Sequence, residues 1–136
     1  MSYSLEFPYR HLYDSRNKIT VPITLLSDSS RWVDVVAAVD SGSTFNIFDR
    51  VCAESLGLSI ELGLRQQIGT AVGSFYCYGH ELTVSVFDLE WQALVYFAEP
   101  EAFNINVVGR VGFLDRLHVG IVDYDRLLYL GPYDQE

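Results

Sequence analysis

The chain has 136 residues, a formal net charge of −9 and 49% hydrophobic residues. This length fits one domain over residues 1-136, with enough apolar content for a core without disulfides or metal. The acidic charge disfavours nucleic acid and anionic membranes as partners, because both require a basic surface. No uncharged apolar run reaches the length of about eighteen residues expected of a transmembrane helix.

Two cysteines, Cys52 and Cys77, are too few for a secreted scaffold held by disulfides. We interpret them as buried free thiols, with a disulfide or a nucleophilic role as the alternatives. The first residues show no basic start followed by an apolar stretch, so no secretory signal is evident. We therefore expect a cytoplasmic location.

The first expected strand spans residues 19–25, where apolar residues alternate with polar ones. Pro22 within it indicates an edge, or a position whose N–H is not needed. The second expected strand, residues 33–39, is apolar apart from Asp34, which predicts burial of both faces. This strand ends at Asp40.

A tight turn, Ser41-Gly42-Ser43-Thr44, follows Asp40. Asp49 is then placed to cap a short helix through residue 56, and Gly57 is placed to end it. Further along, residues 82–86 and 89–97 again alternate between apolar and polar side chains, as strands do.

The C-terminal part predicts a second short helix over residues 110–117 and two more strands over residues 119–124 and 127–130. The fold class is therefore mainly β with one or two short helices. Many short strands separated by turn residues favour a closed barrel or a sandwich.

Asp40 is an ionisable residue at the end of an apolar strand. A buried carboxylate is costly unless hydrogen bonds or charges compensate it, and Ser41, Gly42 and Ser43 form a turn rich in donors. The same residues are also ordinary turn composition, in which an Asp bonds its own backbone. Asp40 alone is therefore a weak indication of catalysis.

Two downstream segments strengthen that indication. Val107, Val108, Gly109 and Arg110 form an apolar pair followed by glycine at the start of an expected helix. Between this segment and Asp40, the glycine-bearing residues 68–76 are flanked by strand-like sequence. They can therefore form a long hairpin.

This ordered set resembles the retropepsin-like aspartic peptidases, which include retroviral proteases and small bacterial relatives. Residues 38–43 match the family pattern of two apolar residues, Asp, Ser or Thr, Gly and a small residue. Residues 66–80 correspond to the family's flap hairpin, and residues 107–110 match its apolar–apolar–Gly–Arg segment. The resemblance covers residues 19–130.

The resemblance implies a single retropepsin-like lobe with the closed acid-protease barrel, acting as a two-fold homodimer. Asp40 would be the catalytic carboxylate, and Ser41 would join the two active-site turns across the dimer axis. The active-site turn would comprise Ser41, Gly42 and Ser43. The substrate-binding flap would comprise Ala71, Val72, Gly73 and Ser74. The support beneath the turn would comprise Val108, Gly109 and Arg110.

One position departs from the viral pattern. Viral members often carry an Asp four residues after the catalytic one, and it pairs with the Arg of the Gly-Arg segment. Thr44 stands at that position here. Arg110 therefore needs another partner, such as a backbone carbonyl or Asp115.

The activity implied is that of an aspartic endopeptidase, a hydrolase acting on peptide or protein substrates without a cofactor. Its mechanism needs two carboxylates around one water, and this chain offers one such turn. Each of two copies would supply one Asp40, with residues 3–7 and 127–130 as candidates for the interface sheet. The net charge predicts that such a dimer tightens as salt rises.

Two alternatives remain open at this stage. One is a non-proteolytic binding or scaffold protein that keeps the same fold, and the other is a monomer with an unrelated barrel. His11, His80 and His118 lack the spacing of metal ligands, so we expect no metal site. Residues 69–74 lack the lysine of a phosphate-binding loop, and Ser41 and Ser43 lack a nucleophile elbow.

Overall fold

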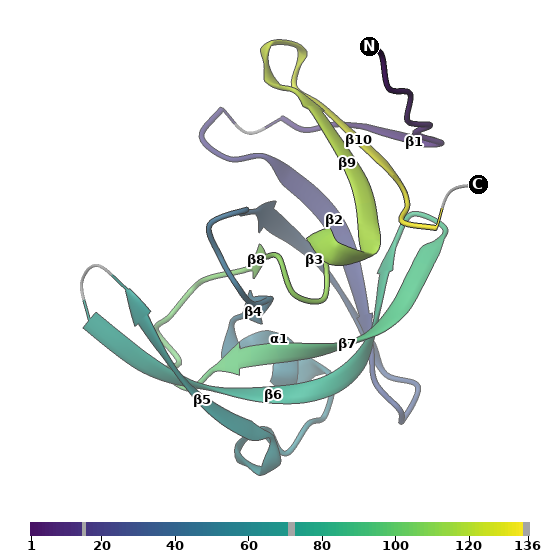
Figure 1. Ribbon diagram of the computed structural model, residues 1–136. Coiled ribbons are helices and arrows are strands. Elements are labelled where there is room, and N and C mark those ends of the chain that lie inside the picture. The colour runs from purple at the N-terminus through teal and green to yellow at the C-terminus, as the bar shows by residue number, and fades with distance from the viewer. Residues whose placement is uncertain (15, 71–72, 135–136) are drawn as a thin grey trace.

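A computed structural model describes residues 1–14, 16–70 and 73–134 (Figure 1). The strands are β1 (Tyr9–Leu12), β2 (Thr20–Leu26), β3 (Trp32–Val39), β4 (Ile47–Phe48), β5 (Leu64–Thr70), β6 (Gly73–Val86), β7 (Leu89–Ala98), β8 (Val107–Val108), β9 (Leu117–Val122) and β10 (Leu127–Pro132). The helices are α1 (Arg50–Ser55) and the 3-10 helices η1 (Ile60–Leu62), η2 (Leu114–Arg116) and η3 (Asp123–Asp125). The predicted mainly β fold with short helices is confirmed.

The described strands form two sheets. The larger has the order β2-β3-β8-β4-β7-β6-β5, and the smaller has the order β1-β10-β9. Strand β2 also pairs with β6 through Thr24, Leu25 and Leu26, which folds the larger sheet back on itself. In Figure 1 the smaller sheet lies at the top, and the β5–β6 hairpin reaches out at the lower left.

Alternating side chains build most of the core. In β2, Val21, Ile23 and Leu25 are buried, whereas Pro22 between them is exposed. The pairing of β2 with β6 does not extend to Pro22, so the N–H that proline lacks is not needed there. The strands predicted over residues 19–25, 82–86 and 89–97 are all confirmed.

Strand β3 corrects one expectation. Trp32 is 65% exposed and Val36 is 62% exposed, whereas Ala37 is fully buried. Only one face of β3 therefore packs on the core, and the prediction that both faces are buried is wrong. An apolar run shows that a strand can be buried, but burial also requires an element to cover each face.

The two predicted helices differ in outcome. Helix α1 is confirmed: Asp49 accepts a hydrogen bond from the Cys52 amide, with 3.1 Å between N and O, and Gly57 adopts a φ of +69° after the helix. The second helix reduces to η2, because Gly112 has a φ of +92° and interrupts the turn before it. No helix among the described residues is long and apolar enough to cross a membrane.

The terminal segments also depart from expectation. Residues 3–7 form no strand, and β1 pairs with β10 instead, through Tyr9 opposite Leu130. Since β9 pairs with the other edge of β10, that strand has no free edge to add to a sheet formed with a second copy. A place for residues 127–130 in an interface sheet stays a prediction, with β10 as the central strand of the smaller sheet.

Candidate active site

Asp40 lies where two distant parts of the chain run side by side. Strands β3 and β8 are parallel neighbours, with Val39 opposite Val108. Directly after β3, the Asp40 amide donates to the Val108 carbonyl, with 3.0 Å between N and O. Strand β4 pairs with β8 on the other side, Ile47 opposite Val107. The position of Asp40 is thus fixed by a strand almost seventy residues downstream.

The turn after β3 holds the Asp40 carboxylate through the backbone. The Gly42 amide donates to Asp40 Oδ1 (N···O 2.9 Å), and the Ser43 amide donates to the Asp40 carbonyl (3.1 Å). Ser43 in turn donates its hydroxyl to the Phe45 carbonyl (2.8 Å). Asp40, Ser41 and Gly42 are exposed in the single chain. The carboxylate is therefore oriented by a backbone N–H and accessible to a substrate or a second copy.

Gly109 lies directly beneath this turn. A Cβ at this position would lie 2.4 Å from the Ser43 carbonyl oxygen and 2.6 Å from the Phe45 carbonyl oxygen. The Gly109 amide donates to Oδ1 of Asn46, and the Arg110 amide donates to the Ser43 carbonyl (2.9 Å). Only glycine allows two backbones to approach this closely.

The side chain of Arg110 is exposed, and it makes no ion pair or hydrogen bond within the described parts of the chain. Asp115, the carboxylate suggested for it, instead accepts a hydrogen bond from the Gly112 amide and lies 3.7 Å from Arg116 Nε. The expected pairing of Arg110 with Asp115 is therefore wrong. Arg110, Thr44 and Ser41 line one surface hollow beside the active-site turn.

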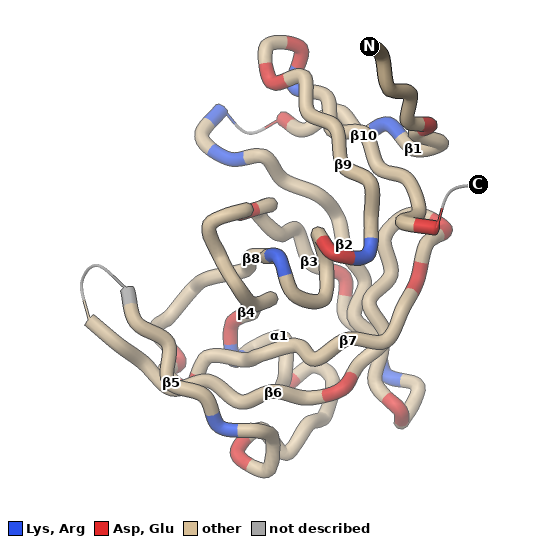
Figure 2. Tube along the Cα trace, viewed as in Figure 1, with Lys and Arg blue, Asp and Glu red and all other residues tan. Residues whose placement is uncertain are grey.

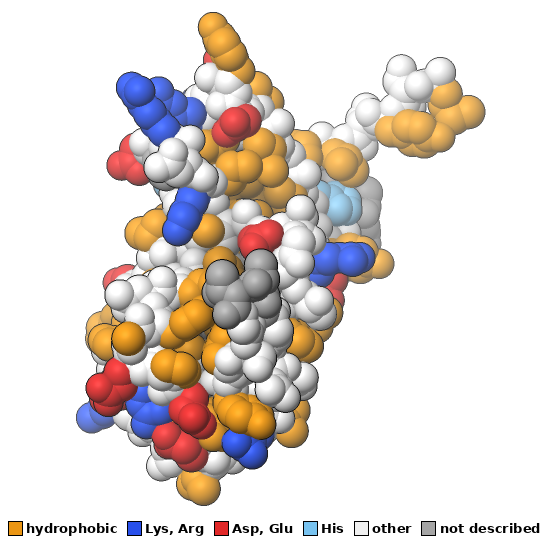
Figure 3. Space-filling view, turned by 90° about the vertical axis from the view of Figure 1, so that its left-hand side faces the viewer, with side chains coloured by type: hydrophobic (Ala, Val, Ile, Leu, Met, Phe, Trp, Pro, Cys, Tyr) orange, Lys and Arg blue, Asp and Glu red, His pale blue; other side chains and the backbone are white. Residues whose placement is uncertain are grey.

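Two further hollows flank Asp40, and both are lined by Asp40, Ile105 and Val107. One, of about 410 Å³, lies towards the β5–β6 hairpin and is called the hairpin-side hollow. Its other apolar walls include Phe45, Ile47, Ile68 and Phe75. Figure 3 shows the face that contains the mouth of the site, with apolar side chains gathered along it.

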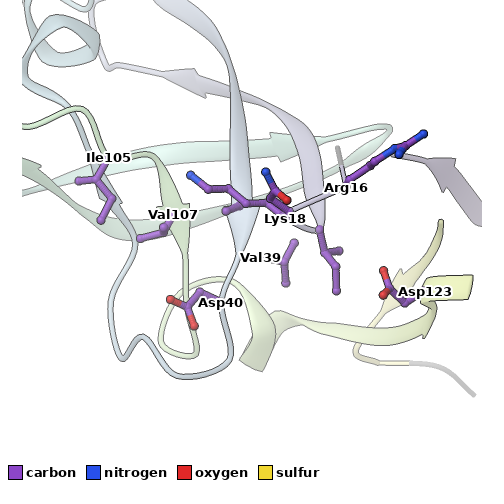
Figure 4. Close-up of a pocket in the computed structure, with 10 residues that line it drawn as sticks. Arg16, Lys18, Val39, Asp40, Ile105, Val107 and Asp123 are labelled. Atoms are coloured by element: carbon purple, nitrogen blue, oxygen red, sulfur yellow. The ribbon is translucent and has the colours of Figure 1, made fainter. Parts of the chain in front are cut away.

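The second hollow, of about 470 Å³, lies towards the loop between β1 and β2 and is called the loop-side hollow. Arg16, Asn17 and Lys18 contribute from that loop, and Asp123 contributes from η3. Figure 4 shows Arg16 and Lys18 on one side of this hollow, with Asp40 and Asp123 on the opposite side.

Strands β5 and β6 form the hairpin predicted over residues 66–80. The pairing includes Gln66 opposite Cys77 and continues to Gly69 opposite Ser74. Towards its outer end, where Ile68 lies opposite Phe75, the Phe75 ring packs on the Phe103 ring, with 4.2 Å between centroids. Of the predicted flap-tip residues, Gly73 and Ser74 are exposed in β6, and Ala71 and Val72 lie outside the described residues.

Sequence reasoning missed several residues of this region. Asn46 is 1% exposed and links the turn to Gly109, but a single buried asparagine leaves no recognisable pattern in the sequence. Arg16 and Lys18 did leave a recognisable pattern, because two of the nine basic residues of this acidic chain lie within three consecutive positions.

The two cysteines contribute no reactive thiol to the site. Both Cys52 and Cys77 are buried and free, as predicted. Burial raises the pKa of each thiol to about 12, so both are protonated at neutral pH. No group of three metal-ligating side chains is present within residues 1–14, 16–70 and 73–134.

Comparisons with known proteins show a likeness of fold. No protein-family model and no curated protein matches the chain. A retropepsin-like aspartic protease from Rickettsia conorii aligns over 89% of this chain and 98% of its own, with 17% identity and a TM-score of 0.66. EIAV protease, complexed with the inhibitor HBY-793, aligns over 72% of this chain and 86% of its own, with 14% identity and a TM-score of 0.53. The chain therefore has the fold of a single retropepsin-like lobe.

Proposed function

We propose that residues 1-136 form a retropepsin-like aspartic endopeptidase, whose attacking water is held between Asp40 and the Asp40 of a second copy. The observation that carries the proposal is the place of Asp40. Its carboxylate is exposed on a turn held by the Gly42 amide, between two hollows and on the side of the β5–β6 hairpin. The fold likeness to aspartic proteases supports a hydrolase in general.

One chain supplies one carboxylate, and the reaction needs two. When two Asp40 side chains face each other, their like charges keep them from ionising together, so one retains a proton. The ionised carboxylate takes a proton from the water as the water oxygen attacks the peptide carbonyl carbon. The protonated carboxyl hydrogen-bonds to the carbonyl oxygen and stabilises the charge that develops there. The C–N bond then breaks as the leaving nitrogen takes up a proton.

An extended peptide fits the shape of the site. Gly69 in the hairpin has no atom within 4 Å of the Cβ that a side chain would add, and Gly42 beside Asp40 carries no side chain. A peptide backbone can therefore pass between the hairpin and the turn. Side chains of an extended peptide alternate in direction, so neighbouring residues would enter the two different hollows beside Asp40.

The face carrying the active-site turn is the proposed dimer surface. Ser41, Thr44 and Arg110 line its hollow together with Val111, which is 52% exposed. Exposed apolar and polar groups on one face suit a two-fold contact, in which the same surface is used twice. In this arrangement the Ser41 hydroxyl and the Arg110 guanidinium would find partners in the second copy.

The test is cleavage of an unfolded protein such as reduced casein between pH 3 and 7, comparing wild type with Asp40→Asn. We expect loss of at least about three orders of magnitude in rate, because the variant removes the ionisable pair. Asp28→Asn, in an exposed loop, is the matched control and should retain activity. Cleavage that survives Asp40→Asn would refute the proposal. Absence of cleavage by the wild type at every pH would favour a binding or scaffold protein instead.

A further inference from the structure

The surface hollow beside the active-site turn, about 500 Å³ in volume, is called the turn-side hollow. It is lined by Ser41, Thr44, Arg110, Val111, Leu114 and Asp115. Of these described residues, Arg110 carries the one positive charge and Asp115 the one negative charge, and both are exposed. In Figure 2 a basic segment follows β8 directly, and an acidic segment lies further along the same stretch, before β9. The hollow therefore presents two opposite charges that do not pair within the chain.

Backbone hydrogen bonds hold both charged residues in place relative to Asp40. The Val111 amide donates to the Thr44 carbonyl, with 2.8 Å between N and O. The Asp115 amide donates to the Arg110 carbonyl, with 3.0 Å between N and O. The segment that carries the two charges is thus bonded to the active-site turn itself. A second copy that meets Asp40 therefore also meets this segment.

Both charged groups keep bonding capacity that the single chain leaves unused. Asp115 Oδ1 accepts from the Gly112 amide (2.9 Å), which orients the carboxylate, and Oδ2 has no hydrogen bond to any residue that the structure describes. Arg116 Nε lies 3.7 Å from Oδ1, which is longer than a charge-assisted hydrogen bond. The planar guanidinium of Arg110 can bind a carboxylate through paired hydrogen bonds, and it has no partner in the described part of the chain.

We propose, on the basis of the dimeric peptidase above, that Arg110 of each copy binds Asp115 of the other and so fixes the register of the active dimer. Two Asp40 carboxylates that hold one water lie close together, so Ser41, the next residue, lies against the second copy. The turn-side hollow begins at Ser41 and is covered by the same contact. A two-fold axis repeats every contact, so the dimer contains this pair twice.

Charge disfavours the other two-fold registers of this surface. Arg110 facing Arg110, or Asp115 facing Asp115, would bring like charges together as water is excluded. Covering Arg110 with neutral groups alone would bury an unpaired charge, which is costly. The reciprocal register pairs both charges. Val111, which is 52% exposed, and the half-buried Leu114 lie between them in the sequence and supply the apolar contact.

The first experiment reverses each charge in a separate chain. Arg110→Asp has only negative charges at the two positions, and Asp115→Arg has only positive ones. Each should therefore associate with itself about a hundredfold more weakly than the wild type. In an equimolar mixture both contacts again join opposite charges, and association should return to within about threefold of the wild type. Sedimentation equilibrium at pH 7 measures the full chains, alone and mixed.

Mixing separates a contact between copies from a contact within one chain, because a pair formed inside each chain would not be restored by a second variant. The control chains Arg31→Asp and Asp28→Arg make the same changes of charge at exposed positions, before the start of β3 and far along it from Asp40. They should associate as the wild type does. The inference is overturned by a mixture no tighter than its components, by reversed chains that associate normally, or by a wild type that stays monomeric at millimolar concentration.

Neutral variants decide the question if a reversed chain does not fold. Asp115→Asn keeps the oxygen that accepts from the Gly112 amide, and Arg110→Gln keeps a polar side chain. Each should weaken association about tenfold, and the double variant should be no weaker than either, because loss of one partner already removes the contact. Losses that add up in the double variant would overturn the inference.

Cleavage of reduced casein distinguishes this inference from the peptidase function. Arg110→Asp and Asp115→Arg should each cleave poorly alone, and their mixture should regain cleavage at the concentrations at which it associates. A wild type that cleaves as a dimer, without rescue in the mixture, overturns the inference and leaves the peptidase function intact. Rescued association with no cleavage by the wild type at any pH would count against the peptidase function alone.

Discussion

The amide of Gly109 donates a hydrogen bond to the side-chain oxygen of Asn46, with 3.0 Å between N and Oδ1. Asn46 is buried, and its own carbonyl accepts from the Tyr96 amide. This one residue therefore joins the segment after the active-site turn to Gly109, and also to β7. Asn46 is thus a polar connection across the interior, and its hydrogen bonds hold the segment that follows the active-site turn in position.

Asn46→Ala should lower the free energy of unfolding by about 1–3 kcal/mol. The substitution leaves the buried Gly109 amide without its acceptor, and an unsatisfied buried donor carries the full cost of its lost solvation. Urea unfolding followed by tryptophan fluorescence measures the change. Asn104→Ala, at an exposed position, is the control and should shift stability by less than about 0.5 kcal/mol. Equal stability of the two variants would contradict the role given to Asn46.

Gly109→Ala should be more damaging, at about 2–4 kcal/mol. The added Cβ would meet two carbonyl oxygens of the backbone, those of Ser43 and Phe45, and backbone atoms cannot rotate away as a side chain can. Gly69→Ala is the matched control, because a Cβ there meets no atom within 4 Å. Thermal unfolding compares the two. A Gly109→Ala melting temperature equal to that of Gly69→Ala would show that the turn can move aside.

Two serines of the turn should separate dimer formation from folding. Ser41 is exposed and its hydroxyl has no partner within the described chain, whereas Ser43 donates to the Phe45 carbonyl at 2.8 Å. Ser41→Ala should therefore weaken association of the proposed dimer with little change in the stability of the separate chain. Ser43→Ala should lower that stability by about 1 kcal/mol.

Analytical ultracentrifugation measures the association of these two variants, and chemical unfolding at low protein concentration measures their stability. Association of Ser41→Ala that equals the wild type would remove this hydroxyl from the proposed interface. A Ser43→Ala chain of unchanged stability would show that its hydrogen bond to Phe45 contributes little.

The two buried thiols should be protected in the native chain. Burial raises the pKa of Cys52 and Cys77 from 9.0 to about 12, so a thiol reagent at pH 8 should label neither until urea exposes both. Above pH 9 the unfolded chain loses these protons while the native chain keeps them. Stability should therefore fall as pH rises from about 9 to about 12. Fast labelling of either thiol in the native chain would contradict this expectation.

Local patterns in the sequence predicted a substantial part of the fold. The alternation in residues 19–25 predicted β2, because successive side chains of a strand point to opposite faces. The Asp49 cap and the Gly57 stop predicted the ends of α1, because both act on the backbone a few residues away. The same short range explains the success at the active-site turn, where Asp40, Gly42 and Ser43 bond to one another.

The tertiary structure decided what depends on distant neighbours. The apolar run of β3 could not show that Val36 stays exposed, since burial requires another element to cover it. Nor could the residues around Arg110 show that Asp115 bonds the Gly112 amide instead. The sequence by itself determined that an aspartate ends an apolar strand in a turn of hydrogen-bond donors. Folding decided that Arg16 and Lys18, more than twenty residues earlier, line a hollow beside that aspartate. The antiparallel pairing of β2 with β3 brings the loop before β2 to the end of β3, where Asp40 lies.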